Sequence, residues 1–113
     1  GEQMGWAPSI DMYEKEDCFV IYAELPGVEM DDCDISMTGD TLTIKGERKP
    51  PEEAKDVEYL CSEICYGNFS RSIDIPAVCD SEKIGATSHN GMLEIRLEKV
   101  KEAIPARIQI TAR

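Results

Sequence analysis

Apolar and polar residues alternate with a period of two along most of the chain, which predicts β-strands rather than helices. Residues 18–23 are apolar at every position, so both faces of this strand would be covered and it would lie centrally in a sheet. Leu25-Pro26-Gly27-Val28 ends the strand, because proline lacks a backbone donor and glycine permits a turn.

The same alternation predicts a first hairpin. Ile35 and Met37 alternate with polar residues, Gly39-Asp40 suits a two-residue turn, and the alternation resumes over residues 41–45. We expect Gly46 to close this hairpin.

A second hairpin is centred on Asn90-Gly91, the pair that type I′ turns favour. Ile84 and Ala86 precede the turn, and apolar residues alternate with charged ones over residues 93–98. Several short strands with frequent turns predict an all-β fold, an immunoglobulin-like antiparallel β-sandwich.

Residues 47–56 interrupt the pattern with seven charged side chains and two prolines, so neither core nor regular strand is expected there. Val57, Tyr59 and Cys61 then alternate again. A long polar excursion that carries a strand is unusual inside one small domain. One explanation is that this strand pairs outside its own domain, because a swapped segment replaces equivalent contacts at little cost.

Arg71 shares the parity of Phe69, Ile73 and Ile75, which puts a charge on the apolar face of a predicted strand. Its side chain either extends past the apolar edge to water or forms an ion pair or hydrogen-bond hub at a subunit interface. The pattern alone leaves both alternatives open.

Ile108 and Ile110 would project the same way from an extended chain, about 7 Å apart. The segment is either a final core strand or a plug that adds to a sheet edge and inserts both side chains into pockets.

Length and charge narrow the class of protein. The chain has 113 residues, enough for one domain, and a net charge of -11, which argues against nucleic acid as a partner. No apolar stretch approaches the roughly 20 residues that cross a bilayer, so no membrane partner is expected. Residues 11–34 carry nine acids against one lysine. This is either a solvated acidic face or a surface that attracts a basic tail from another copy.

The chemistry of an enzyme is not evident. The five cysteines form no C-x-x-C motif and there is one histidine, so we expect no metal, no cofactor and reduced thiols in a cytoplasmic protein. The alternative is a redox-sensitive pair, Cys61 and Cys65. Phosphate-binding loops, H-E-x-x-H and G-x-S-x-G are missing from the sequence, and we expect no enzymatic activity.

Taken in order, the motifs resemble the α-crystallin domain of bacterial and plant-type small heat-shock proteins, the Hsp20 family. The resemblance runs from Trp6 to Ile110. Its segments are Trp6-Ala7-Pro8, residues 24–28 (ELPGV), 42–48 (LTIKGER), 66–71 (YGNFSR), Ile75-Pro76, Ala86, 90–93 (NGML) and 108–110 (IQI). Met92 departs from the family pattern, in which valine is common.

The resemblance implies a division of the chain. Residues 1–5 would be a residual N-terminal segment, 6–98 the α-crystallin domain with a dimerisation loop and strand at 47–66, and 99–113 a C-terminal extension. The family usually has a variable arm before the domain. About five residues are too few to build one, which puts large assemblies in doubt.

The resemblance also implies roles for three sets of residues. The dimer interface would contain Ile10, Met12, Val57, Tyr59, Cys61 and Arg71. The groove for the tail would contain Cys33, Ile35, Met37, Ile84 and Ala86, and the tail motif would be Ile108 and Ile110. The resemblance implies three kinds of partner. They are a second copy that exchanges a strand with the first, further copies bound through the tails, and unfolding client proteins.

The implied function is that of an ATP-independent chaperone that holds unfolding proteins and prevents their aggregation. The alternative is a co-chaperone domain of the p23/CS type, which has a similar sandwich but acts as a monomer.

Overall fold

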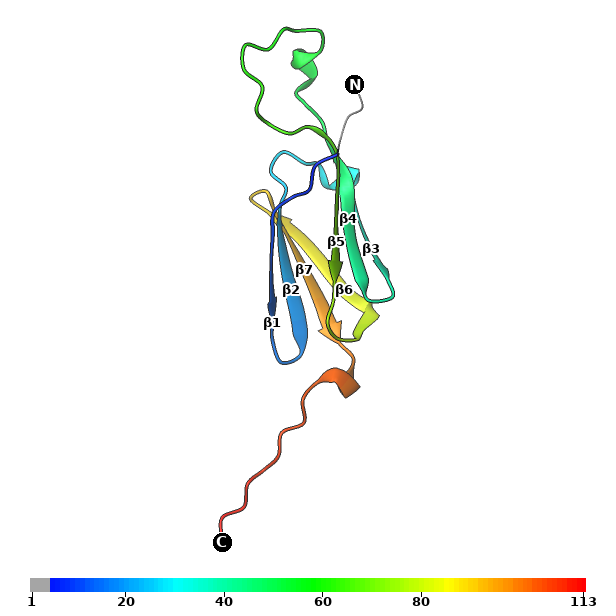
Figure 1. Ribbon diagram of the computed structural model, residues 1–113, viewed down its shortest axis with the longest axis vertical. Coiled ribbons are helices and arrows are strands. Elements are labelled where there is room, and N and C mark those ends of the chain that lie inside the picture. Colours follow the sequence, from blue (N-terminus) through cyan, green and yellow to red (C-terminus); the bar gives the residue numbers. More distant parts are fainter. Residues whose placement is uncertain (1–4) are drawn as a thin grey trace.

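The computed structural model describes residues 5–113, so most of the predicted N-terminal segment, residues 1–4, lies outside the described residues. The described residues form two antiparallel sheets and three single-turn 3₁₀ helices (Figure 1). The strands are β1 (Ile10–Glu14), β2 (Cys18–Glu24), β3 (Cys33–Thr38), β4 (Thr41–Arg48), β5 (Gly67–Asp74), β6 (Cys79–His89) and β7 (Met92–Lys99). The helices are η1 (Met30–Asp32), η2 (Glu52–Ala54) and η3 (Lys101–Ala103).

One sheet has the order β1-β2-β7-β6 and the other the order β3-β4-β5. The predicted antiparallel β-sandwich is therefore confirmed. β2 lies between β1 and β7, as its apolar run predicts, and residues 18–21 of β2 are all buried.

The core lies between the two sheets, where alternate residues of facing strands pack together. The four-stranded sheet and the turn after β2 supply Phe19, Ile21, Ala23, Leu25, Leu93, Ile95 and Leu97. The three-stranded sheet and the turn after β5 supply Leu42, Ile44, Phe69, Ile73 and Ile75. Removing each large apolar side chain from water stabilises the fold by about 1.5–3 kcal/mol.

Both predicted hairpin turns are present. Asn90 and Gly91 both have positive φ, 52° and 78°, which is the conformation of a type I′ turn. Gly39, with φ of 59°, begins the turn between β3 and β4.

The expectation for Gly46 is wrong, because β4 continues through it to Arg48. A Cβ atom at this position would lie 2.1 Å from the carbonyl oxygen of Asp32 and 2.8 Å from the ring of Phe69. Gly46 is therefore required by close approach inside the strand and not by a turn. The polar excursion consequently begins two residues later than predicted, at Lys49.

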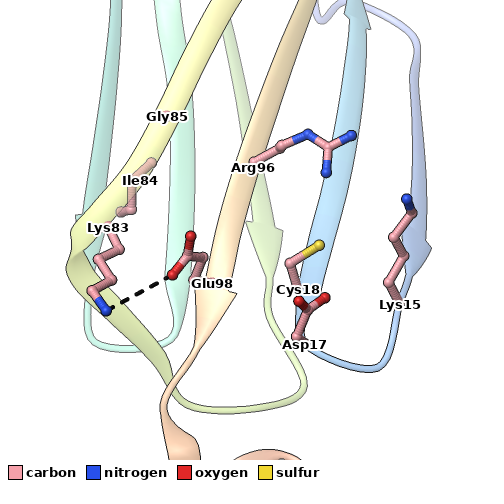
Figure 2. A pocket seen from close by; sticks show the side chains of 8 residues that line it. All are labelled: Lys15, Asp17, Cys18, Lys83, Ile84, Gly85, Arg96 and Glu98. Atoms are coloured by element: carbon pink, nitrogen blue, oxygen red, sulfur yellow. Dashed lines mark ion pairs between the residues drawn. The ribbon is translucent and has the colours of Figure 1, made fainter.

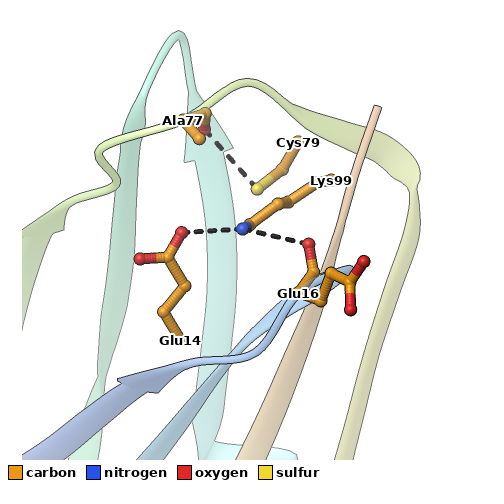
Figure 3. Close-up of polar contacts among 5 residues, drawn as sticks. All are labelled: Glu14, Glu16, Ala77, Cys79 and Lys99. Carbon is orange, nitrogen blue, oxygen red and sulfur yellow. Dashed lines mark hydrogen bonds and ion pairs between the residues drawn. The ribbon is translucent and has the colours of Figure 1, made fainter. Parts of the chain in front are cut away.

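A buried lysine closes the end of the sandwich opposite the loop that follows β4. The side chain of Lys99 is 4% exposed, and its Nζ donates to Glu14 at 2.7 Å and to the backbone carbonyl of Glu16 at 3.2 Å (Figure 3). The same Nζ lies 5.1 Å from the centre of the Phe19 ring. Because Lys99 is the last residue of β7, the extension leaves the sandwich one residue later than predicted.

Candidate protein-interaction site

The loop between β4 and β5, residues 49–66, projects beyond the sandwich and contains no strand (Figure 1). The alternation at Val57, Tyr59 and Cys61 is therefore not realised as a strand in the single chain. An isolated extended segment has nothing to complete its backbone hydrogen bonds, so alternation alone does not make it a strand.

Apolar side chains of this loop face water. Val57 and Tyr59 are about half exposed, Ile64 is 61% exposed and Leu60 is completely exposed. Exposed apolar residues that are grouped on one segment are typical of protein-interaction sites.

β1 forms one edge of the four-stranded sheet, with β2 on its only paired side among the described residues. Ile10 and Met12 lie opposite Ala23 and Ile21, so both point toward the core side of the sheet. Ile10 packs against the core, whereas Met12 is 40% exposed at the rim. The free edge of β1 can accept a further strand.

Arg71 lies on the inner face of β5, opposite the fully buried Ile44. Its side chain is partly buried and forms no ion pair or side-chain hydrogen bond with any residue that the structure describes. The five donors of a guanidinium normally find acceptors when they are partly buried. The structure therefore shows a charge on an apolar face, as predicted, and leaves its partner open.

The five residues predicted to border a tail groove lie on two edge strands, β3 and β6, of different sheets. Cys33, Ile35 and Met37 of β3, together with Ile84 of β6, are partly buried and pack against the core, whereas Ala86 is exposed. Burial raises the pKa of the Cys33 thiol, and neighbouring Asp34 adds to the effect. Both strands present apolar side chains next to a backbone edge that is unpaired within the described part of the chain.

A hollow of about 750 Å³ lies on the outer face of the four-stranded sheet (Figure 2). Its lining combines Lys15, Lys83 and Arg96 with Asp17 and Glu98. Lys83 and Glu98 are 4.0 Å apart, and both are largely exposed. These opposite charges largely offset one another, so the hollow favours no single class of charged ligand.

The tail is extended and leaves the sandwich at the end opposite the loop (Figure 1). Ile108 and Ile110 are 89% and 92% exposed, so this segment is not a final core strand. Arg107 forms an exposed ion pair of 3.1 Å with Glu16, which lies in the acidic region of residues 11–34.

The five thiols differ in burial and none is part of a disulfide. All five cysteines are free, with Cys18 buried and Cys61 and Cys65 exposed. Burial raises the pKa of the Cys79 thiol, an effect that the nearby ammonium of Lys99 opposes. Within residues 5–113 no cluster of three or more possible ligands could hold a metal ion. None of the helices in this same part of the chain is both long and apolar enough to traverse a bilayer.

The sequence did not predict the contacts of two structurally important residues, Lys99 and Arg48. The sequence motifs place Lys99 in the extension and Arg48 at the end of the segment 42–48, and they predict no contact for either side chain. Arg48 donates to the backbone carbonyls of Cys65 and Pro26, which lie in segments far apart in the sequence. Only the position of Arg48 immediately before the polar excursion could have indicated this contact.

The described residues thus form a two-sheet sandwich whose edge strands have one side unpaired among these residues, with an exposed apolar loop and an exposed apolar tail. The model of the Hsp20/alpha crystallin family matches residues 11–111. The chain therefore belongs to this family, whose members are small heat-shock proteins. This finding favours the small heat-shock protein interpretation over the p23/CS alternative.

Individual relatives support the assignment. The chain is 35% identical over 105 residues to small heat shock protein C4 of Rickettsia felis, which covers 93% of this chain and 64% of that protein. The chain thus spans less than two thirds of the length of that relative.

Solved structures agree in fold. Heat shock protein 16.0 from Schizosaccharomyces pombe superimposes with a TM-score of 0.79 at 35% identity, over 95% of this chain and 98% of that chain. A small heat-shock protein from Xylella fastidiosa, described as having a distinct high order structure, gives 0.77 at 34% identity, over 96% and 100%.

Proposed function

We propose that this protein is an ATP-independent holdase, which binds unfolding proteins through exposed apolar surfaces and prevents their aggregation. The observation that carries the proposal is the exposure of apolar side chains on the loop and on the tail, at opposite ends of the sandwich. Unfolding proteins expose apolar segments, and burying these against the loop, the tail or the edges beside them is favourable without ATP. The net charge of -11 would help keep such complexes dispersed.

The first partner in this proposal is a second copy. The loop at residues 49–66 would extend to the partner, where Val57, Tyr59 and Cys61 would pair with the free edge of β1 near Ile10 and Met12. Two features support this arrangement: the segment has alternating residues but no strand in one chain, and the edge of β1 is unpaired among the described residues. Arg71 would find its acceptor at the same interface.

The second contact joins dimers. Ile108 and Ile110 of one chain would insert beside the apolar residues of β3 and β6 in another dimer, at Cys33, Ile35, Met37, Ile84 and Ala86. The almost complete exposure of both isoleucines supports this contact, as do the edges of the two strands, which are unpaired among the described residues. Clients would compete with tails for these edges.

This mode of action requires binding alone, so we propose no catalysis and no cofactor. We also place the protein in the cytoplasm. The five free thiols support a reducing compartment, because exposed cysteines persist unpaired where glutathione and thioredoxin keep them reduced.

An aggregation assay tests the proposal. A heat-labile client such as citrate synthase is warmed without ATP, and light scattering is followed with increasing amounts of this protein. We expect scattering to fall as the ratio of protein to client rises, and the client to appear in a larger complex in size-exclusion chromatography. Scattering that is unchanged at a molar excess, with an inert globular protein as control, would contradict holdase activity.

A further inference from the structure

Arg48 connects three segments that meet at the base of the loop. Its Nε and Nη2 both donate to the carbonyl oxygen of Cys65, at 2.9 and 2.6 Å, and its Nη1 donates to that of Pro26 at 3.1 Å. Its guanidinium also lies 4.2 Å from the centre of the Trp6 ring. One side chain therefore contacts the start of the domain, the turn after β2 and the end of the loop.

Trp6 is itself fixed in place, so it provides a firm support for Arg48. The backbone of Trp6 donates to Asn68 and accepts from Ser70, each at 3.1 Å, and its indole N–H donates to Gly67 at 3.2 Å. Its ring packs 5.0 Å from that of Phe69, which is buried. The guanidinium stacked on this ring gains a cation–π contact as well as its hydrogen bonds.

The contact between Arg48 and Cys65 joins residues 17 positions apart, at the two ends of the loop. It therefore closes the base of the loop and limits the directions in which residues 49–64 can leave the sandwich. The apolar residues Val57, Tyr59 and Leu60 lie beyond this closure and have no comparable anchor among the contacts of the described residues.

We propose that Arg48 is a positioning residue for dimerisation, which directs the loop toward the second copy without contacting that copy. This inference rests on the proposed exchange of the loop. A loop with free ends must lose conformational freedom when it binds, whereas a loop that is already closed at its base loses less. The role requires the forked geometry of arginine, because both carbonyl groups are bound at once.

The test compares three variants of the full chain by measuring the dimer dissociation constant in sedimentation equilibrium. R48A removes the hydrogen bonds from residue 48 to Cys65 and Pro26. R48K keeps the positive charge but cannot donate to both carbonyl groups together. K45A is the matched control, because Lys45 is an exposed cation on the same strand, β4, and forms no side-chain hydrogen bond or ion pair with the described residues. We expect dissociation constants to rise by about tenfold or more for R48A and R48K and by less than about twofold for K45A.

Unfolding of each variant is followed by circular dichroism, so that a general loss of stability can be separated from weaker dimerisation. R48A with a lowered melting temperature but an unchanged dissociation constant would make Arg48 merely structural and overturn the inference. R48K that dimerises like the parent would also overturn it, since charge alone would then suffice. If R48A does not fold, R48K decides the question in the same way.

The parent protein separates this inference from the proposed function. A parent that dimerises while R48A and R48K dimerise equally well contradicts only the role of Arg48. A parent that stays monomeric at all concentrations contradicts the exchanged dimer, and the role of Arg48 falls with it.

Discussion

The sandwich and its two appendages, the loop at residues 49–66 and the tail at residues 100–113, use the same apolar residue types for opposite purposes. In the sandwich, Ile44 and Ile95 are completely buried. In the appendages, Leu60, Ile108 and Ile110 are almost completely exposed. Apolar area stabilises a chain only when it leaves water, so burial within one chain stabilises the sandwich, whereas the appendages would gain such stabilisation only where a partner covers them. The difference separates residues that hold the fold from residues that, in the proposed function, bind partners.

The largest expected effect is on stability and tests this separation directly. Ile95→Ala should lower the free energy of unfolding by about 2–5 kcal/mol, because it leaves a cavity between the sheets. Ile110→Ala removes the same atoms from an exposed position and should change it by less than about 0.5 kcal/mol. Urea unfolding at one protein concentration measures both. Equal losses would show that the tail packs against its own sandwich.

The next effect concerns Arg71, which lies in the sandwich but has no acceptor among the described residues. Arg71→Ala should weaken the dimer by about 1.5–3 kcal/mol, the usual value for a hydrogen bond to a charged group. Ser70→Ala, on the exposed face of the same strand, is the control and should leave the dimer unchanged. Isothermal dilution calorimetry gives both dissociation constants. If Arg71→Ala dimerises with the same dissociation constant as the parent, the Arg71 side chain extends to water and contributes nothing to the interface.

A smaller effect is expected at the tail. Replacing Ile108 and Ile110 together by Ala should leave the dimer intact and reduce any larger assembly, because the two apolar contacts to another dimer are lost. Gln109→Ala is the control between them. Light scattering coupled to size-exclusion chromatography reports the masses. If larger assemblies persist in the double variant, Ile108 and Ile110 do not form the contact between dimers.

The smallest effect is on the dependence of stability on pH. Burial raises the pKa of the thiols of Cys33 and Cys79 in the folded state. Below the unfolded thiol pKa of about 8.5, both thiols are protonated in the folded and in the unfolded state, and their contribution to the stability of the fold is complete. This contribution is lost as the pH rises through the higher pKa values of the folded state, because the unfolded state releases its protons first. Unfolding should therefore become slightly easier above about pH 9, and Cys33→Ser with Cys79→Ser should reduce this slope. If the free energy of unfolding of the double variant has the same slope against pH as that of the parent, these two thiols are not the source of the slope.

The sequence predicted those parts of the fold that depend on local pattern. Alternation placed the strands, and Asn90-Gly91 and Gly39-Asp40 marked their turns. The position of Gly46 within β4 could not be predicted, since it depends on the approach of Asp32 from another segment. The burial of Lys99 depends likewise on Glu14, which is 85 positions away in the sequence.

The candidate site was predictable to a different degree. The alternation at Val57, Tyr59 and Cys61 predicted a binding segment in the loop, and the spacing of Ile108 and Ile110 predicted one in the tail. Their conformations in the single chain follow from a lack of neighbours, which no local pattern encodes. Arg48 was missed because its contacts to Trp6, Pro26 and Cys65 are all distant in the sequence.

The central claim is that the exposed loop is covered by a second copy of the chain. Sedimentation equilibrium over a wide range of concentration tests it most directly. The account predicts a mass twice that of one chain, and a Val57→Asp variant whose dimer dissociates at much higher concentration, since the new charge would be buried in the interface. A parent that remains monomeric at every concentration would contradict the claim.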